Sequence, residues 1–243
     1  MFFSPTYLIY MLPAFILMGL TSWYVKSSYN KWSRVQASSR LTGAQAAQRL
    51  LSTGSMYGVK IQTVAGDLTD HYDPRDKTLY LSPGVANVAS VASVAIAAHE
   101  LGHAMQDAED YLPLRFRSAL VPVVNIGSNL GWILIMIGLF LRLTNLAWLG
   151  IIIFAGGALF ALATLPVEFN ASARAKQLLV QTGIIQTDEE QRGVNAVLNA
   201  AALTYVAGLV TAILQLLYYV SVSYTHLRAH ETDSYLVCRL LLE

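Results

Sequence analysis

The sequence predicts a mainly α-helical integral membrane protein with four membrane-spanning helices. Of its 243 residues, 55% are hydrophobic and 13% are charged, and that charged fraction is roughly half of the soluble-protein average. Four windows contain no Asp, Glu, Lys or Arg: 7–25, 118–141, 143–167 and 193–227. Each window can hold the ~20 apolar residues that span a bilayer. The formal net charge of +1 argues against a nucleic-acid-binding protein.

The first span, within residues 1–26, is predicted to be a retained N-terminal anchor. It lacks both the basic start and the small-residue cleavage site of a secretory signal peptide. No charged residue precedes this span, whereas the chain beyond it is basic, with Lys26, Lys31 and Arg34 close by. By the positive-inside rule, we expect the N-terminus outside the cell and the following region in the cytoplasm.

Residues 27–118 are predicted to form a cytoplasmic α+β region that begins and ends with helices. Thr42 and Gln45 have the spacing of a capping box, so we expect a helix to begin there and to end near Ser52. An Ala-rich stretch predicts a second helix over residues 86–109.

Two short segments of this region, residues 59–64 and 78–82, have the alternating or β-branched pattern of strands. The Asp-rich segment 66–77 between them is predicted to be a turn region. We expect residues 78–82 to form an edge strand. Such a strand either holds an extended peptide by backbone hydrogen bonds or is simply part of a small sheet.

The second half of the chain is predicted to contain three spans. Two of them form a hairpin over residues 119–166, because only four residues separate their apolar runs. Residues 167–199 are polar again and are expected to lie in the cytoplasm. Within them, Thr187 and Glu190 form a second capping-box pattern. The helix that begins there continues into the fourth span, over residues 200–221.

Residues 222–243 differ in character from the rest of the chain and resemble the translated read-through of a transposon-based sequencing adapter. The match covers the whole segment in one reading frame. We therefore expect a non-native tail outside the fold; the alternative is a genuine polar tail carrying His226, His230 and Cys238. Without the tail the chain has no cysteine, which excludes disulfide and thiolate chemistry.

The predicted Ala-rich helix contains a metal-binding motif, His99-Glu100-Leu-Gly-His103. Histidines at positions i and i+4 lie one turn apart on the same helix face, so both imidazoles can reach one ion. Zinc suits them, because catalytic zinc sites use three protein ligands and water. Glu100 is then placed to take a proton from water that attacks a carbonyl. The alternative is an amphipathic helix with satisfied polar residues.

Glu168, directly after the third span, is the candidate third ligand. Two spans separate it from His103, so the chain returns to the same side of the membrane and the two side chains can meet there. An odd number of spans would have made this pairing impossible. Alternatively, Glu168 is only a carboxylate at a helix end that caps the next helix.

Other polar residues near these motifs have weaker interpretations. Ser172 lies one turn beyond Glu168 and could orient a ligand, or it could be a small packing residue. Arg174 could pair with a carboxylate near the metal or simply mark the cytoplasmic side. His71 and Tyr72 are candidate oxyanion stabilisers or ordinary solvated loop residues. Three acidic residues are expected to form a solvated helix end: Asp107, Glu109 and Asp110.

Three segments carry a family resemblance: GDLTDHYDP, AAHELGHAMQ and LPVEFNASARA. With them, the chain resembles the bacterial membrane-bound neutral zinc metallopeptidase family of the YugP type over residues 1–221. The resemblance implies a zincin-like, gluzincin-type site with His99 and His103 as zinc ligands, Glu100 as the catalytic base and Glu168 as the third ligand. The segment after Glu168 also resembles the HtpX-type and CAAX prenyl protease group. That group has an acidic residue where this chain has Ser172.

The sequence therefore predicts a membrane-embedded zinc endopeptidase of the bacterial cell (inner) membrane, acting at its cytoplasmic face. Its expected cofactor is Zn²⁺, and its expected partners are the lipid bilayer and peptide or protein substrates, with membrane proteins among the candidates. One alternative is a non-catalytic membrane scaffold that keeps zinc for structure. Another is a site-2-type intramembrane protease, although the LDG-like motif of that design does not occur here.

Overall fold

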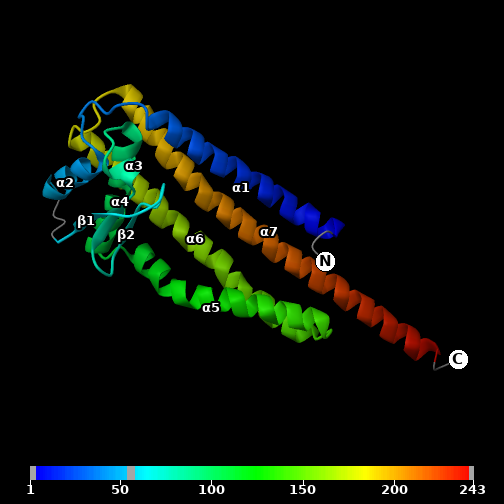
Figure 1. Cartoon of the computed structure of the whole chain (residues 1–243). Coiled ribbons are helices and arrows are strands. Elements are labelled where there is room, and N and C mark those ends of the chain that lie inside the picture. Colours follow the sequence, from blue (N-terminus) through cyan, green and yellow to red (C-terminus); the bar gives the residue numbers. More distant parts are fainter. Residues whose placement is uncertain (1–3, 54–57, 241–243) are drawn as a thin grey trace. The chain divides into compact units, whose positions relative to one another are not determined.

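The computed structural model describes residues 4–53 and 58–240, with side chains described as far as residue 225. Four long helices dominate it (Figure 1): α1 (Pro5–Trp32), α5 (Leu112–Phe140), α6 (Thr144–Gln181) and α7 (Asp188–Leu240). Each contains a stretch long and apolar enough to cross a membrane, and that of α7 lies within Asp188–Thr225. This agrees with the four expected spans.

The long helices continue well beyond the apolar runs that the sequence identifies. With 38 residues and a rise of 1.5 Å per residue, α6 is about 57 Å long, whereas the hydrocarbon core of a bilayer is about 30 Å thick. The polar end of α6, which carries Glu168 and Arg174, is thus a continuation of the third span. The expected polar segment 167–199 is consequently built from the ends of two helices, α6 and α7.

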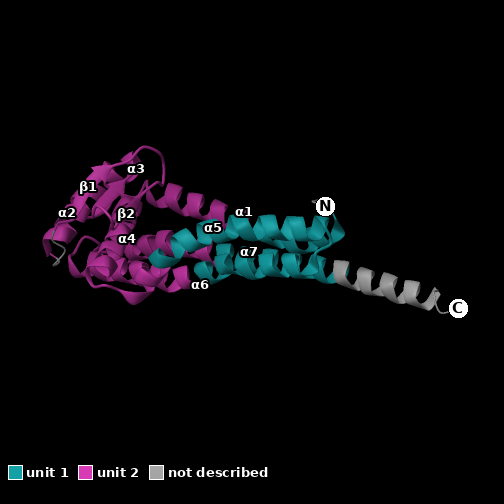
Figure 2. Ribbon diagram, turned by 90° about the horizontal axis from the view of Figure 1, so that it is seen from below, with its two compact units in different colours: residues 1–18, 118–162, 207–243 teal, residues 19–117, 163–206 magenta. Residues whose placement is uncertain are grey.

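The chain divides into two compact units whose boundaries fall inside the long helices (Figure 2). The first comprises residues 1–18, 118–162 and 207–243. Here α5 and α6 form the expected hairpin, and glycines allow their backbones to approach closely. A Cβ on Gly138 would lie 2.5 Å from the backbone nitrogen of Ala147, and one on Gly131 would lie 2.9 Å from the carbonyl oxygen of Gly150. Small residues commonly allow membrane helices to pack in this way.

The second unit comprises residues 19–117 and 163–206 and contains a small three-stranded sheet. Its strands are β1 (Lys60–Thr63), β2 (His71–Asp73) and β3 (Thr78–Leu81), in the order β1-β3-β2. β1 is parallel to β3, and β2 is antiparallel to it. The helices α2 (Gly43–Thr53), α3 (Pro83–Ala86) and α4 (Val91–Ala108) complete the unit.

The expectation that residues 78–82 form an edge strand is wrong, because β3 is the central strand and is paired on both sides. Its interior position explains why Leu79 and Leu81 are fully buried. The second partner is β2, which lies in the polar segment predicted to be only a turn. The strand His71–Asp73 is too short and too polar for its alternation to identify it.

Both predicted capping boxes are present. Thr42 N–H donates to Oε1 of Gln45, and Gln45 N–H donates back to Oγ1 of Thr42, at 3.0 and 3.3 Å. The Thr187–Glu190 pair makes the same reciprocal bonds at the start of α7. The helix predicted over residues 86–109 begins later, at Val91, because Ser90 caps it by accepting a bond from the N–H of Ser93.

The Glu190 carboxylate does more than cap α7. It is buried, and it also accepts hydrogen bonds from the backbone N–H groups of Ser38, at 2.6 Å, and Gln186, at 3.0 Å. Ser38 lies 152 positions earlier in the chain. One side chain therefore joins the segment after α1 to the turn before α7.

We expect Glu190→Gln to lower the free energy of unfolding by about 1–3 kcal/mol, because it replaces a carboxylate that serves several backbone donors. The thermal unfolding midpoint in detergent measures this effect. Glu189→Gln is the matched control, since Glu189 is the exposed neighbour on the same helical turn. Equal midpoints for the two variants would contradict the role given to Glu190.

Candidate metal centre

Helix α4 presents two imidazoles side by side. His99 and His103 are one turn apart, and their ring centroids are separated by 4.9 Å with the planes 82° apart. Each side chain is 12% exposed. Small residues surround them on this helix, and Ala98, Leu101 and Ala104 are buried in the core, so the histidine face is held by packing on the opposite side.

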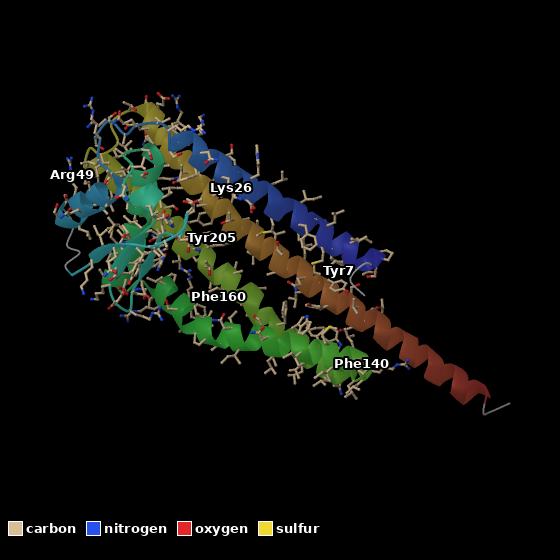
Figure 3. The ribbon with its side chains drawn as sticks, viewed as in Figure 1. Tyr7, Lys26, Arg49, Phe140, Phe160 and Tyr205 are labelled. Carbon is tan, nitrogen blue, oxygen red and sulfur yellow. The ribbon has the colours of Figure 1, made fainter. Side chains whose placement is uncertain are left out.

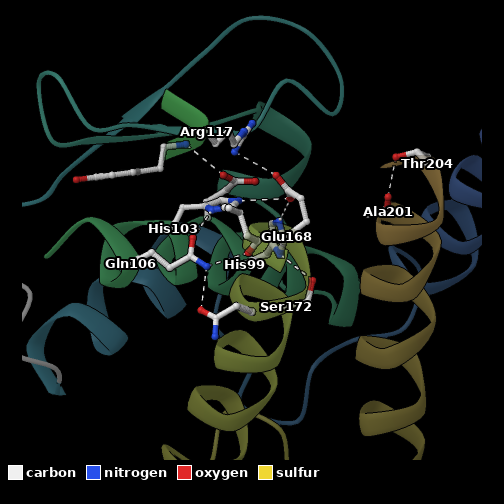
Figure 4. A network of polar contacts seen from close by, with 12 residues as sticks. His99, His103, Gln106, Arg117, Glu168, Ser172, Ala201 and Thr204 are labelled. Carbon is white, nitrogen blue, oxygen red and sulfur yellow. Dashed lines mark hydrogen bonds and ion pairs between the residues drawn. The ribbon is translucent and has the colours of Figure 1, made fainter. Parts of the chain in front are cut away.

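Glu168 approaches the two imidazoles from α6. Its side chain is only 2% exposed, and Oε2 lies 3.4 Å from Nε2 of His99 and 3.6 Å from Nε2 of His103 (Figure 4). One candidate ligand atom from each of the three residues lies within 4.8 Å of the others. The structure thus brings together the three residues that the sequence predicts as metal ligands, although 65 positions separate Glu168 from His103.

Gly102 allows α4 and α6 to come this close. A Cβ at this position would lie 2.6 Å from the carbonyl oxygen of Ala171 and 3.0 Å from its Cα. Side-chain Cβ atoms do not occur at such distances from backbone atoms, so only glycine fits between the two histidines at this crossing. The residue between the ligands on α4 therefore sets the distance to the helix that carries Glu168.

The geometry fits a zinc ion. Four-coordinate zinc with bonds of about 2.0–2.1 Å separates its ligand atoms by about 3.3 Å, close to the two spacings between Glu168 and the histidines. Oε2 of Glu168 is also buried without a hydrogen-bond partner. A buried carboxylate oxygen without a partner is costly, and a cation between it and the imidazoles removes that cost. The donor set of two imidazoles and one carboxylate is one that catalytic zinc uses.

Gln106 fixes the orientation of His103. Its side chain is fully buried, and its amide nitrogen donates to the carbonyl oxygen of Val167 and to Oδ1 of Asn170. Its oxygen is therefore the acceptor for Nδ1 of His103, at 3.0 Å. With the hydrogen on Nδ1, the lone pair of Nε2 is directed at the cluster. Such partners of metal-binding histidines hold the ring and its tautomer.

Ser172 plays the corresponding part for His99. Its hydroxyl lies 3.2 Å from Nδ1 of that ring, and its side chain is buried. The contact leaves Nε2 of His99 facing Glu168. The serine that stands where the HtpX-type pattern has an acidic residue thus contacts a candidate ligand directly.

Two residues beside Glu168 were not identified from the sequence. Arg117 lies at 3.3 Å from Oε1 of Glu168, and the side chain of Tyr205 also interacts with this carboxylate. Arg117 engages one oxygen and leaves the other turned towards the histidines. Arg117 directly precedes the second apolar window, where a cation is usually explained by the positive-inside rule. Tyr205 lies inside an apolar run, and nothing in its pattern distinguishes it (Figure 3).

Arg174 does not contact the cluster directly and is connected to it through Asn170 and Gln106. It donates to Oδ1 of Asn170 at 2.7 Å and forms an ion pair with Glu109 at 2.7 Å. Since Asn170 also accepts from Gln106, a chain of polar contacts leads from His103 to the exposed Glu109 carboxylate. Arg174 is thus paired with a carboxylate, but that carboxylate is the exposed Glu109 and not one of the cluster.

Glu100 lies next to the cluster on the side of the sheet. Its Oε2 accepts a hydrogen bond from the backbone N–H of Tyr72 at 3.1 Å. Burial raises the pKa of Glu100 above its ordinary value, and the neighbouring histidines oppose that shift. The carboxylate is thereby held beside the ligands by an edge strand, β2, rather than by its own helix.

The two candidate oxyanion stabilisers face in opposite directions, as neighbours on a strand do. Tyr72 points to α4, where its hydroxyl donates to Asp107 at 2.9 Å. His71 stacks on Tyr80 at 4.9 Å, and its Nδ1 contacts the carbonyl oxygen of Thr69. The structure does not bring His71 to the cluster. The acidic helix end is solvated as expected at Glu109 and Asp110, which are exposed, and its three carboxylates also have partners: Tyr72 for Asp107, Arg174 for Glu109 and Arg115 for Asp110.

These features define a multi-pass membrane protein with a buried His-His-Glu cluster suited to a metal ion. The family model described as "Putative neutral zinc metallopeptidase" matches residues 7–224, and the chain belongs to this family. It is 46% identical over 208 residues to a Bacillus subtilis (strain 168) protein named "Putative membrane protease YugP", covering 84% of this chain and 92% of that relative. No solved structure matches the chain. The family expected from the sequence is thereby confirmed.

We expect Gly102→Ala to weaken zinc binding by at least about 10-fold, because a Cβ would push α6 and its Glu168 away from the histidines. Competition with a fluorescent zinc chelator measures the affinity. Gly156→Ala on α6 is the matched control, since a Cβ there meets no atom within 4 Å. Unchanged affinity in the Gly102 variant would show that the helix spacing does not set the site.

Gln106→Leu is expected to weaken zinc binding by about 10- to 100-fold, the usual effect of removing a hydrogen-bond partner of a metal-binding histidine. The substitution keeps the volume similar but frees Nδ1 of His103. The same chelator competition measures it. A variant that binds zinc as tightly as the parent protein would contradict the positioning role of Gln106.

Proposed function

We propose that this chain is a zinc-dependent endopeptidase that hydrolyses peptide bonds of peptide or protein substrates at the cytoplasmic face of the bacterial cell (inner) membrane. The observation that carries the proposal is the unpartnered Oε2 of Glu168 facing two Nε2 atoms, with a second carboxylate, Glu100, beside them. Family membership supports it. A structural zinc site is usually closed by four protein ligands, and among the described residues only three converge here.

Zinc bound by His99, His103 and Glu168 supplies Lewis-acid chemistry, polarising a carbonyl oxygen and lowering the pKa of water. The remaining steps belong to the chain's own side chains. Glu100 takes a proton from the water whose oxygen attacks the substrate carbonyl carbon. When the C–N bond breaks, Glu100 gives that proton to the departing amine nitrogen. The N–H of Tyr72 holds the Glu100 carboxylate in orientation for both transfers.

The substrate backbone is best accommodated along β2. It is an edge strand, and its Tyr72 N–H points away from β3 towards Glu100. An extended peptide can add to a sheet edge by main-chain hydrogen bonds, and here it would use backbone groups of β2 other than the Tyr72 N–H, which is donated to Glu100. A peptide bound there would run past the candidate catalytic base, which is the position that hydrolysis requires.

The charge distribution supports a cytoplasmic site. Residues 26–118 contain ten basic residues and residues 167–199 contain three, whereas the turn of the hairpin contains one, Arg142. Basic residues are enriched in cytoplasmic loops. The segments that supply His99, His103 and Glu168 are therefore assigned to the same, cytoplasmic, side.

We expect Glu100→Gln to retain about one zinc per chain and to lower kcat/KM for fluorescein-labelled casein by about 10²- to 10⁴-fold, the usual contribution of a general base. Glu168→Ala is expected to lose zinc and activity together. Elemental analysis and the casein assay measure the two quantities, with Glu189→Gln as an unaffected control.

Each result separates the candidate functions. Full activity in Glu100→Gln with zinc retained would favour the non-catalytic scaffold, because a structural site does not need this carboxylate. Full zinc in Glu168→Ala would remove Glu168 from the ligand set.

A further inference from the structure

A cavity of about 200 Å³ lies within the second unit, directly beside the candidate metal centre. His99 and Glu100 are among the residues that line it. Its other walls are mostly apolar and come from four parts of the unit: Val25 of α1, Leu68 of the loop before β2, Ile96 of α4, and Val197, Leu198 and Ala201 of α7. The cavity therefore combines two residues of the proposed active site with mostly apolar walls.

Helical spacing explains why apolar side chains and residues of the metal centre line the same cavity. On α4, Ile96 precedes His99 and Glu100 by three and four positions, so all three share one face. On α7, Ala201 precedes Tyr205 by four positions, and Tyr205 lies close enough to the Glu168 carboxylate to feel its charge. Each of the two helices thus carries an apolar side chain one turn away from a residue of the metal centre.

The chemistry of the walls selects against acidic side chains. No Lys or Arg is among the described residues that line the cavity. The other carboxylate that lines the cavity, Asp70, is already engaged, because its oxygens accept hydrogen bonds from the backbone N–H of Ser82 at 2.7 Å and from its hydroxyl. An acidic substrate side chain in the cavity would meet the carboxylates of Asp70 and Glu100, and no Lys or Arg side chain there would compensate.

The size of the cavity matches a large apolar side chain. A dry cavity of about 150 Å³ in a protein core accepts a benzene molecule, so the observed volume is sufficient for a leucine or phenylalanine side chain. Two of the contributing helices, α1 and α7, are long and apolar enough to cross a membrane. Peptide segments rich in such side chains are the hydrophobic segments of membrane proteins.

We propose that this cavity is the specificity pocket of the site and that it selects substrates with a large apolar residue next to the cleaved bond. The proposal rests on the proposed peptidase function and names its substrate class. Val197, Ile96 and Ala201 are then specificity-determining residues, and the residues of the metal centre are not involved in the selection.

The test uses the zinc-loaded full chain in nanodiscs and a set of quenched fluorescent decapeptides that differ only at one central position, occupied by Ala, Leu, Phe, Lys or Glu. We expect kcat/KM to be at least about 10-fold higher for Leu and Phe than for Ala, Lys or Glu, with cleavage beside the variable residue by mass spectrometry. Equal rates across the set, or a preference for Lys, would overturn the proposal while leaving the peptidase function intact.

Two variants test the pocket itself. Ala201→Phe fills it and is expected to reverse the preference towards Ala by about 10-fold or more, whereas Ile96→Ala enlarges it and is expected to favour Phe over Leu. Leu203→Phe is the matched control, since Leu203 is 44% exposed on the same helix. A uniform loss of rate for every peptide in Ala201→Phe, with zinc retained, would mean that the residue is only structural.

A binding measurement separates this proposal from the function on which it rests. The same peptides, labelled for fluorescence anisotropy, are titrated into zinc-loaded Glu100→Gln protein. Tighter binding of the Leu and Phe peptides, abolished by adding Ala201→Phe, supports the pocket even if the parent protein cleaves nothing, in which case only the peptidase function fails. Equal affinities across the set would overturn the pocket.

Discussion

The burial of the Glu168 carboxylate is the constraint on which the rest of the second unit depends. A charge that is 2% exposed is stable only where cations or strong donors compensate for its lost hydration. Arg117 engages one oxygen, and the other oxygen faces the two imidazoles. A divalent cation at the cluster would complete that compensation. The packing of α4 against α6 buries Glu168 beside the histidines, and a bound cation would offset the cost of that burial. Metal binding would therefore stabilise the same helix packing that forms the site.

The supports of the cluster come from distant parts of the sequence and are joined by few contacts. Gly102 permits the close crossing of α4 and α6, Gln106 and Ser172 hold the two rings, and β2 holds Glu100. None of these contacts is large in energy. Their effect is geometric, because each removes one rotation that would move a donor atom away from the others.

Much of this arrangement follows from the sequence, since its strongest signals are local. The charge-free windows identify the spans, and the two capping boxes identify helix starts that the structure confirms. The i, i+4 spacing places both imidazoles on one face. Because an even number of spans separates His103 from Glu168, the sequence alone predicts that both residues lie on the same side of the membrane and can meet.

What escaped prediction depends on contacts between distant segments. The strand β2 is three residues long and is formed by pairing with β3, so its own residues do not identify it, and β3 was consequently expected at an edge. Arg117 and Tyr205 belong to sequences whose ordinary explanation is membrane orientation or apolar packing. Only the position of Glu168 gives these two residues a further role.

The connectivity of the cluster has a consequence for biosynthesis. The histidines are translated before the hairpin of α5 and α6, and Glu168 is translated after it. In the fold described here, the third donor joins the first two across the hairpin of α5 and α6. Completion of the His-His-Glu cluster is therefore linked to formation of the hairpin that separates its donors in the sequence.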